Sequence, residues 1–487
     1  MFQLNYEKKG GIMAVKEFVT KQIFKQLLPM VGNMSDENFG RFLSLARRLA
    51  PNEFTKSFMG ALIKLREEQH PVIELLKRAF NRPNPNVRER LINSLLIKHH
   101  WYGSVRRNEV RSQGLHVPGV ILISPTMRCN LHCTGCYASK YSTEEDLEFE
   151  VIDRVLSEME ELGIFWGTIL GGEPFIRQDM WQLYEKHNDI FFQIYTNGTL
   201  VDKEKARKLA ELGNILVIFS LEGFEEETDA RRGMGVFQKV MQGMDNLQEV
   251  GVPFGFSVMA TRQNIDTLVS DEFYDMLVEK GCLIGWQFLY LPVGLNPDAS
   301  LMPTAEQREL LRVRGPRYMR SQKPIFTIDF WNDAPHMGGC IAGARHFLHI
   351  TSHGDVEPCI FIHLATDNIH DKSLREVINS PFFRAFRDRQ PYCKNLLRPC
   401  TIIDHPQVLR EICNECHPHA TDGPVCGLIT SPLSDALDKY SQEVAKIMDP
   451  VWEQEFADFR FTGSLLPEKF APEGDVGREG SGVKPAD

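Results

Sequence analysis

The sequence has no apolar run that approaches the roughly 20 residues a membrane-spanning helix needs. Its first residues, MFQLNYEKKGG, also lack the apolar segment of a secretory signal. We therefore expect a cytoplasmic protein, in which disulfides are rare. Cysteine is scarce too, and the odd count of 11 in 487 residues favours reduced thiols or metal ligands over disulfide pairs.

Acidic residues outnumber basic ones and give a formal net charge of −10, but the first hundred residues are basic. Residues 13–112 hold 18 Lys and Arg against 9 Asp and Glu. Such a segment suits either an anionic partner or the acidic remainder of the same chain. Both interpretations stay open, and we expect no nucleic-acid partner.

Residues 13–115 are predicted to form a basic helical region. Apolar residues recur at three- and four-residue spacing from Val15 to Leu28, so they share one helix face. Pro83 and Pro85 mark a break between later helices. Lysines on the first helix keep peripheral membrane contact open as a minority interpretation. The codons implied before Met13 resemble a ribosome-binding site, so we expect Met13 to be the start.

From Gly119 onward, short apolar runs alternate with helical stretches. The strands are predicted at Val120–Ile123, Thr168–Leu170, Phe191–Tyr195, Leu216–Ser220, Phe254–Val258 and Gly285–Leu289. Strands that alternate with helices form a parallel sheet with right-handed crossovers. Six such units form a doubly wound sheet or a partial barrel over residues 116–325. Both folds place ligands at the carboxyl ends of the strands.

Residues 326–430 are irregular and rich in cysteine, proline and histidine, and they contain seven of the eleven cysteines. Such a stretch builds little apolar core, so we expect a metal to hold it together. Asp329, Asp333 and Asp404 are candidate general acids, but no local pattern singles one out. Residues 431–487 are predicted to form a helix followed by a disordered tail.

Three cysteines, Cys129, Cys133 and Cys136, directly follow the first predicted strand. Three thiolates on one short loop can hold three irons of a cubane cluster and leave the fourth iron open to a ligand. A zinc site or buried free thiols would also explain the spacing, but the spacing favours a cluster. A second motif, Gly171-Gly172-Glu173-Pro174, follows the second strand, where two glycines allow the backbone to approach a ligand closely.

Together these two motifs resemble the radical S-adenosylmethionine (SAM) superfamily over about residues 118–300. The resemblance implies a partial (β/α)6 TIM-like barrel and a catalytic [4Fe–4S] cluster whose open iron chelates the methionine part of SAM. The implied cofactor contacts are Gly171, Gly172, Glu173, Pro174, Asn197, Ser220, Glu222 and Arg232.

Two positions depart from the family pattern. Gly135 precedes the third cysteine, where the family often has an aromatic residue, and Glu222 stands where Asp is common. These departures concern the contacts to the adenosine, not the cluster.

A third motif joins Cys340, Gly354 and Cys359 and resembles the opening of the SPASM or twitch extension, which binds auxiliary [4Fe–4S] clusters. A β-hairpin fits this stretch, with a turn at Gly354. We expect one or two auxiliary clusters, although the later spacing departs from the family pattern, and a zinc ribbon at the last CX2C pair is the alternative. The candidate ligands are Cys340, Cys359, Cys393, Cys400, Cys413, Cys416 and Cys426.

The resemblance predicts an enzyme that reductively cleaves SAM to a 5′-deoxyadenosyl radical, which abstracts hydrogen from a substrate, under oxygen-free conditions. Relatives with this extension often modify peptides or proteins, so a maturase-like function is predicted. Modification of a lipid or other anionic metabolite is the alternative. An iron–sulfur electron carrier or a zinc-stapled binding protein is the non-enzyme alternative. The predicted electron donor is a flavodoxin or ferredoxin.

Overall fold

A nine-stranded sheet dominates the computed structural model, which describes residues 31–32, 34–49, 53–424, 426–457 and 459. The strand order is β7-β6-β5-β4-β3-β2-β1-β8-β9, in which β1 to β8 run parallel to their neighbours and β9 runs antiparallel to β8. The strands are β1 (Val120–Ile123), β2 (Trp166–Ile169), β3 (Phe191–Thr196), β4 (Ile215–Leu221), β5 (Phe254–Ala260), β6 (Ile284–Leu289), β7 (Phe326–Asp329), β8 (Phe347–Ile350) and β9 (Val356–Glu357). A separate pair joins β10 (Leu364–Ala365) to β11 (His419–Ala420).

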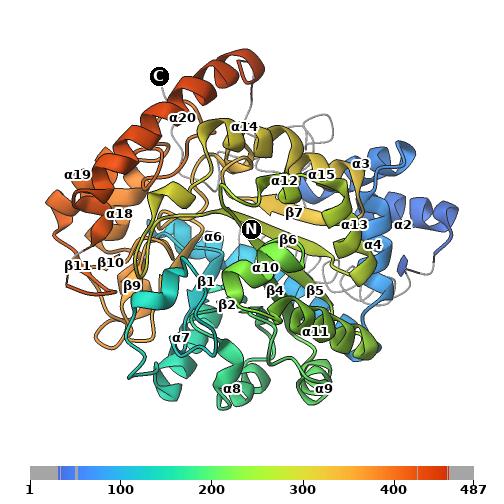
Figure 1. Ribbon diagram of the computed structural model, residues 1–487. Helices are drawn as coiled ribbons and strands as arrows, with labels where there is room; N and C mark the ends of the chain where they lie inside the picture. The colour runs from blue at the N-terminus through green and yellow to red at the C-terminus, as the bar shows by residue number, and fades with distance from the viewer. Residues whose placement is uncertain (1–30, 33, 50–52, 425, 458, 460–487) are drawn as a thin grey trace, which may run out of the picture.

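Helices cover the outer face of this sheet (Figure 1). Strands such as β3, whose sequence Phe-Phe-Gln-Ile-Tyr-Thr is almost wholly buried, are apolar because both of their faces are covered. The helices that follow the strands are α7 (Phe149–Leu162), α8 (Met180–Lys186), α9 (Lys203–Leu212), α10 (Glu225–Arg232), α11 (Val236–Val250), α12 (Ile265–Leu268), α13 (Asp271–Lys280), α14 (Ala305–Arg314), α15 (Pro316–Gln322) and α16 (Ala334–Met337). Short 3-10 turns are η3 (Tyr137–Lys140), η4 (Pro174–Ile176), η5 (Ala299–Leu301) and η6 (Gly427–Ile429).

The predicted α/β class and parallel barrel-like sheet are confirmed, and all six predicted strands lie within two residues of their observed bounds. The sheet continues past residue 325, however, because β7 and β8 extend it at its two ends. β7 reads Phe-Thr-Ile-Asp, and this mixture gave no apolar run to detect. The predicted hairpin is confirmed as β8 and β9, but the parallel pairing of β8 with β1 could not be foreseen from a local pattern.

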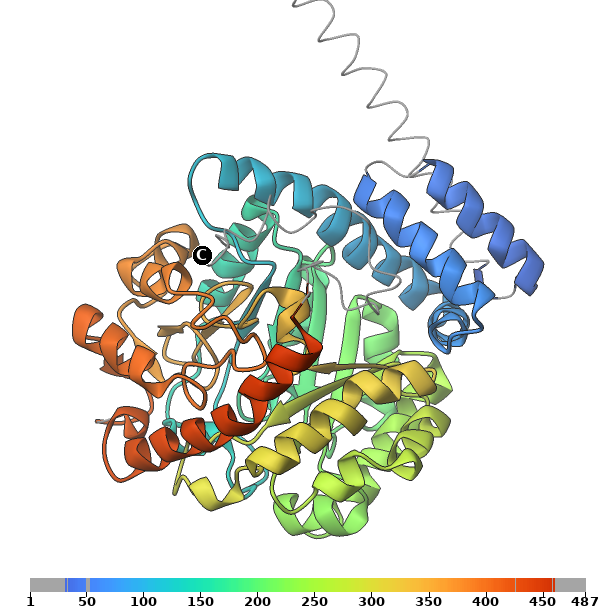
Figure 2. The ribbon, with the colours of Figure 1, turned by 90° about the horizontal axis from the view of Figure 1, so that it is seen from above.

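The N-terminal helices stack along one side of the molecule (Figure 2). They are α2 (Asp36–Leu49), α3 (Glu53–Glu67), α4 (Val72–Asn81), α5 (Pro85–Leu91), η2 (Ile92–Gly103) and α6 (Ser104–Ser112). Phe39, Leu43 and Leu65 are buried in a small core that these helices share. The predicted break at the two prolines is confirmed, because α5 begins at Pro85. The predicted helix from Val15 to Leu28 lies outside the described residues.

Basic side chains attach this region to the barrel. The guanidinium of Arg78 donates to the carbonyl oxygens of Pro324, at 2.9 Å, and Val278, at 2.7 Å. Arg107 donates likewise to the carbonyl of Gly163. Of the two interpretations of the basic segment, the described residues therefore support docking on the same chain, through carbonyl oxygens.

The element η2 is a π-helix, a form often found at functional sites. Its His99 ring lies edge-on to Trp166, the first residue of β2, with 5.5 Å between ring centroids. A Cβ at Gly103 would lie 2.5 Å from the carbonyl oxygen of Gly163, so only glycine permits this approach. The π-helix is thereby held against the amino-terminal end of the sheet.

The C-terminal region has a substantial apolar core, so our expectation of little core there is wrong. Its helices are α17 (Leu374–Ile378), α18 (Pro381–Asp388), α19 (Pro406–Cys416) and α20 (Leu433–Glu455). Phe382, Phe383 and Phe386 on α18 are fully buried in the same core as the barrel. They are buried because α18 is a short amphipathic helix whose apolar face packs inward. α20 lies beside α14 (Figure 1). Within the described residues, no helix is long and apolar enough to cross a membrane.

Candidate active site

The three predicted cluster cysteines lie on one loop after β1 and face a common cavity. The loop turns tightly, because the amide of Cys136 donates to the carbonyl of Cys133 at 3.3 Å. Burial raises the pKa of the Cys129 and Cys133 thiols. Bound iron would replace the thiol protons, so the donor set of three half-buried thiols on one loop fits an iron–sulfur cluster.

The glycine turn after β2 packs against the chain that leads into this loop. The amide of Gly172 donates to the carbonyl of Thr126 at 3.0 Å, and that of Glu173 to Arg128 at 2.9 Å. Gly171 has a φ of +113° and Gly172 would bring a Cβ to 2.1 Å from the carbonyl oxygen of Arg128. Both glycines line the cavity, so bare backbone faces the place where a cofactor would lie.

We expect Gly172→Ala to weaken SAM binding at least tenfold, about 1.4 kcal/mol, because the turn must move away from backbone atoms on the other side. Gly119→Ala is the matched control, since Gly119 lines the same cavity and its Cβ would meet nothing within 4 Å. Equilibrium binding of SAM to the reconstituted protein checks both variants. Equal affinities would show that the close approach of this turn is irrelevant to the cofactor.

Glu173 is buried and does not line the cavity. Its carboxylate accepts from the Thr196 hydroxyl and the Asn197 amide, each at 2.8 Å, and burial raises its pKa to about 7. Asn197 in turn donates to the Cys129 sulfur at 3.7 Å and to the Asn130 side chain at 2.8 Å. The carboxylate thus joins the end of β2 to the end of β3 and supports the cysteine loop. Pro174 likewise lies behind the lining residues.

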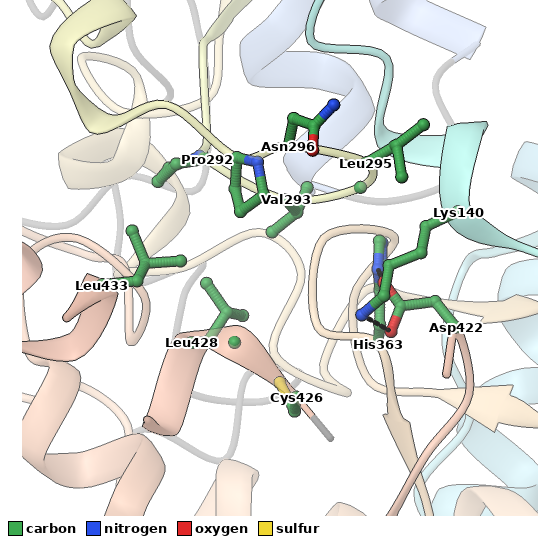
Figure 3. Close-up of a pocket in the computed structure, with 13 residues that line it drawn as sticks. Lys140, Pro292, Val293, Leu295, Asn296, His363, Asp422, Cys426, Leu428 and Leu433 are labelled. Atoms are coloured by element: carbon green, nitrogen blue, oxygen red, sulfur yellow. Dashed lines mark hydrogen bonds and ion pairs between the residues drawn. The ribbon is translucent and has the colours of Figure 1, made fainter. Parts of the chain in front are cut away.

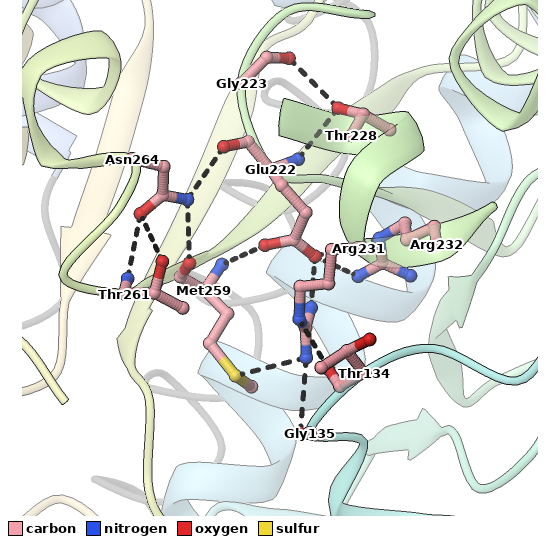
Figure 4. Close-up of polar contacts among 10 residues, drawn as sticks. All are labelled: Thr134, Gly135, Glu222, Gly223, Thr228, Arg231, Arg232, Met259, Thr261 and Asn264. Carbon is pink, nitrogen blue, oxygen red and sulfur yellow. Dashed lines mark hydrogen bonds and ion pairs between the residues drawn. The ribbon is translucent and has the colours of Figure 1, made fainter. Parts of the chain in front are cut away.

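At the end of β4, Ser220 lines the cavity, whereas Glu222 is buried behind it. Figure 4 shows the Glu222 carboxylate between two arginines of α10. Its Oε1 accepts from Arg231 and, at 2.8 Å, from Arg232, while its Oε2 accepts from the Met259 amide at 3.3 Å. The Asn264 side chain also donates to the Glu222 carbonyl at 2.8 Å. Glu222 therefore orients both arginines.

Arg231 is a residue that sequence reasoning missed. Its Nε donates to the carbonyl of Thr134 at 3.1 Å and its Nη2 to that of Gly135 at 3.4 Å (Figure 4). Its own carbonyl accepts from the Thr134 amide at 3.0 Å. Thr134 and Gly135 lie between Cys133 and Cys136, so Arg231 fastens the cysteine loop to the end of β4. No local signal separates it from Arg232.

The cavity measures about 450 Å³ and runs along the inner face of the sheet. At one end it meets the three cysteines and the glycine turn, and at the other it meets His99, Gly119 and the first residues of β1 and β2. Tyr137, next to the last cysteine, also lines it, and its hydroxyl donates to the carbonyl of Gly171 at 3.4 Å.

The C-terminal cysteines fall into two places. Cys340, Cys359 and Cys400 line the same cavity as the catalytic loop. Burial raises the pKa of the Cys340 thiol to about 11, and the neighbouring Cys340 contributes to the raised pKa values of the other two. Cys393 stands apart, with its thiol donating to the carbonyl of Asn395 at 3.2 Å.

The second place holds Cys413 and Cys416, in the last turn of α19, and Cys426. Burial and the two neighbouring thiols raise the pKa of Cys413 to about 12. Among the described residues, no three His, Cys, Asp or Glu side chains are arranged to hold one metal ion, and the ligand sets therefore stay predictions.

Cys426 borders a smaller hollow of about 130 Å³ between residues 292–297 and η6 (Figure 3). Asp422 in its wall bonds the His363 ring at 2.8 Å and pairs with Lys140 at 3.2 Å. Lys140 closes the turn that follows the catalytic loop, so this charged group joins the two cysteine regions.

The candidate general acids are occupied elsewhere. Asp333 pairs with Arg320 at 2.7 Å and Asp404 pairs with Arg308 at 2.6 Å, both buried. Asp329 accepts from the backbone amides of Trp331 and Asn332, and none of the three aspartates lines the cavity. Neighbouring arginines and backbone amides therefore hold these carboxylates away from the cavity.

Sequence reasoning also missed a buried chain of hydrogen bonds. His349 bonds the Ser124 hydroxyl at 2.7 Å and the Glu357 carboxyl at 2.6 Å, and Tyr141 donates to Glu357 at 2.6 Å. This chain of hydrogen bonds joins the end of β1 to the β8–β9 hairpin. It could be found only after the pairing of β8 with β1 was known.

Comparison with known proteins adds independent information. Residues 123–271 match the model of the radical SAM superfamily, and residues 340–417 match that of SPASM, an iron–sulfur cluster-binding domain. Mycofactocin maturase MftC of Mycolicibacterium smegmatis is 31% identical over 295 residues, which cover 57% of this chain and 74% of that protein. PqqA peptide cyclase of Streptomyces rochei is 28% identical, covering 67% of this chain and 93% of that protein.

Two further matches are more limited. Fe-coproporphyrin III synthase of Methanosarcina barkeri is 31% identical over 234 residues, which cover 45% of this chain but only 57% of that protein, less than two thirds of its length. The crystal structure of Streptococcus suis SuiB bound to S-adenosylmethionine superimposes with a TM-score of 0.52 at 18% identity, covering 66% of this chain and 80% of that chain. The structural likeness supports the shared fold. By its matching domains and its coverage of the maturase sequences, this chain belongs to the radical SAM superfamily, among the enzymes that carry a catalytic [4Fe–4S] cluster, SAM and a SPASM domain for auxiliary clusters.

Proposed function

We propose that this protein is a radical SAM maturase that modifies a peptide or protein. The observation that carries the proposal is the match to MftC over 74% of that maturase, supported by the match to PqqA peptide cyclase over 93% of its length. Cysteines of both regions also border one cavity, as a reaction that uses two metal regions on one substrate requires.

Residues of this chain have distinct roles in the proposal. Cys129, Cys133 and Cys136 bind the catalytic cluster, and the backbone of Gly171 and Gly172 faces the methionine part of SAM. When bound, the cluster and SAM together supply a radical that abstracts hydrogen from a C–H bond.

The polar residues at the strand ends act on that site in two ways. Ser220 and Arg232 contact SAM directly, while Glu173, Asn197 and Glu222 hold the loops in place through the bonds described above. The apolar walls of the cavity exclude water from the radical.

The SPASM cysteines bind the auxiliary clusters, with Cys340, Cys359 and Cys400 beside the substrate and Cys413, Cys416 and Cys426 farther from it. A cytoplasmic flavodoxin or ferredoxin supplies the electron. The lysines proposed for membrane contact, which precede Pro29 in the sequence, lie outside the described residues.

The proposal is tested with anaerobically reconstituted protein, dithionite and SAM. We expect 5′-deoxyadenosine and methionine to be released, and a mass change in a peptide encoded by a small reading frame beside this gene. No 5′-deoxyadenosine from a protein with its iron fully loaded would reject the enzyme. Release without any change in the neighbouring peptides, but with a change in a supplied lipid, would reject the peptide substrate.

A further inference from the structure

The inner half of the cavity has a distinct chemical character. It lies along the strands, from Thr168 in the middle of β2 to Trp166 at its amino end, away from the three catalytic cysteines and the glycine turn. Strand residues with side chains on this face include Val120 and Leu122, and large aromatic rings line it at Trp286 and Phe330. A ligand in this half would meet mostly carbon.

The charged side chains of the lining lie at the opposite end. Apart from the six cysteines that we propose as cluster ligands, the only described lining residues with a full charge at neutral pH are Arg231 and Arg232, and Glu222 already pairs with both. No described lining residue is Asp, Glu or Lys. A carboxylate or ammonium group placed in the inner half would lose its hydration and gain no oppositely charged side chain, which is unfavourable.

The two histidines of the inner half do not supply a charge either. Burial, with Arg107 nearby, holds the pKa of His99 well below its usual range. Burial, with Arg345 nearby, does the same to His346. Both imidazoles are therefore neutral at pH 7. The remaining polar groups are neutral, and Gln193 donates to the Tyr195 hydroxyl at 3.0 Å.

One residue of the N-terminal helices lines this half of the cavity. His99 belongs to the π-helix η2, and Gly103 in the same helix contacts the backbone of Gly163. A segment that precedes the barrel in the sequence therefore forms part of the cavity floor.

We infer that the inner half of the cavity binds an uncharged hydrocarbon group of the substrate, aliphatic or aromatic, and that the polar remainder stays at the cluster end. The inference rests on the proposed function and names the chemistry of the substrate part that enters the barrel. An apolar side chain of a peptide and an acyl chain of a lipid both supply such a group. A carboxylate-rich tetrapyrrole, of the kind the coproporphyrin-related relative is named for, does not.

Binding of small probes to the reconstituted holoenzyme with SAM tests the inference, by anaerobic calorimetry without reductant. The peptide probes are N-acetyl-Gly-X-Gly-amides in which X is Leu, Phe, Glu or Lys. The acyl probes are decanamide and decanoate. We expect the uncharged member of each set to bind at least tenfold more tightly than the charged members. Preference for the Leu or Phe peptide over decanamide identifies a peptide side chain, and the reverse preference identifies an acyl chain.

Thr168, in the middle of β2, provides a matched pair of variants because it lines the cavity and is 5% exposed. Thr168→Leu should tighten binding of the uncharged probes at least twofold, and Thr168→Glu should weaken it at least tenfold. Since the buried glutamate can prevent folding, the leucine variant keeps the test decisive. Equal binding of charged and uncharged probes, or weaker binding to Thr168→Leu, would overturn the inference.

The proposed function and the inference about the inner half of the cavity are refuted by different results. Release of 5′-deoxyadenosine on reduction, with no probe present, tests the proposed enzyme. If that release occurs and charged probes still bind as tightly as uncharged ones, the inference about the inner cavity is wrong and the proposed function stands. If no release occurs, the proposed function is wrong whatever the probes do.

Discussion

Replacement of Cys129 by alanine should abolish the release of 5′-deoxyadenosine and remove about four irons from the reconstituted protein. The Cys129 thiol is the first of three on the loop after β1, and two thiols cannot hold a cubane with a single open iron. Its sulfur also accepts from the side-chain amide of Asn197 at 3.7 Å, a bond that alanine cannot make. Iron analysis, together with chromatography of the reaction products, measures both losses.

Cys282 provides the control, because it is a fully buried cysteine of the same barrel. It is 0% exposed and does not line the cavity, so it is a packed thiol and no ligand. Cys282→Ala should keep all of the iron and the full rate of SAM cleavage. A Cys129→Ala protein that still releases 5′-deoxyadenosine would show that the catalytic loop is wrongly assigned.

Replacement of Cys359 should separate the two metal regions. Cys359 lines the cavity beside Cys340 and Cys400 but lies in the C-terminal region. Cys359→Ala should therefore remove iron while SAM is still cleaved. The product of the Cys359→Ala reaction should be 5′-deoxyadenosine without modified substrate.

Much of this arrangement could be predicted from the sequence because it is local. The spacing of Cys129, Cys133 and Cys136 and the Gly171–Gly172 pair both follow predicted strands, and the carboxyl ends of parallel strands meet at one edge of a sheet. The alternation of apolar runs and helices therefore predicted that the two motifs lie near each other, but it gave no distance between them. The family resemblance predicted Ser220 as a further contact, and Ser220 lines the cavity.

Other features depend on contacts between distant parts of the chain. The pairing of β8 with β1 brings His349 to Ser124, and no pattern in either segment contains that register. The division of the C-terminal thiols into two places likewise arises from the fold of residues 340–426, where spacing along the chain was uninformative. The contribution of His99 to the cavity floor depends on a π-helix, which has no distinct sequence period to detect.

Glu222 illustrates a third kind of limit. The family resemblance predicted it as a cofactor contact. In the structure its carboxylate is 1% exposed and pairs with two arginines of α10, behind the residues that line the cavity. What its side chain contacts depends on the placement of α10, which the resemblance did not give.

Replacement of Arg231 should cause the second-largest loss in the rate of SAM cleavage. Arg231→Ala removes the bonds to the Thr134 and Gly135 carbonyls and the ion pair with Glu222. The turn between Cys133 and Cys136 then keeps only the backbone bond from the Thr134 amide to the carbonyl of residue 231, and a displacement of about 1 Å near reacting groups costs on the order of 10²-fold in rate. We expect SAM cleavage to fall by about 10²-fold while the iron content stays full, because all three thiols remain. Rate and iron are measured on the same sample.

Further variants distinguish a specific attachment of the cysteine loop by Arg231 from a general destabilisation of the protein. Arg231→Lys should recover only part of the rate, because an ammonium cannot reach two carbonyls and a carboxylate in one planar fork. Arg106→Ala is the matched control, since Arg106 also bonds a backbone carbonyl, that of Glu161 at 2.9 Å, far from the cysteine loop. It should leave the rate unchanged. Arg231 and Glu222 act through the same ion pair. The double variant Glu222→Gln, Arg231→Ala should therefore lower the rate of SAM cleavage little more than Arg231→Ala alone does. Fully additive losses, or a wild-type rate in Arg231→Ala, would mean that the loop is held by its cluster alone and that the arginine fork is incidental.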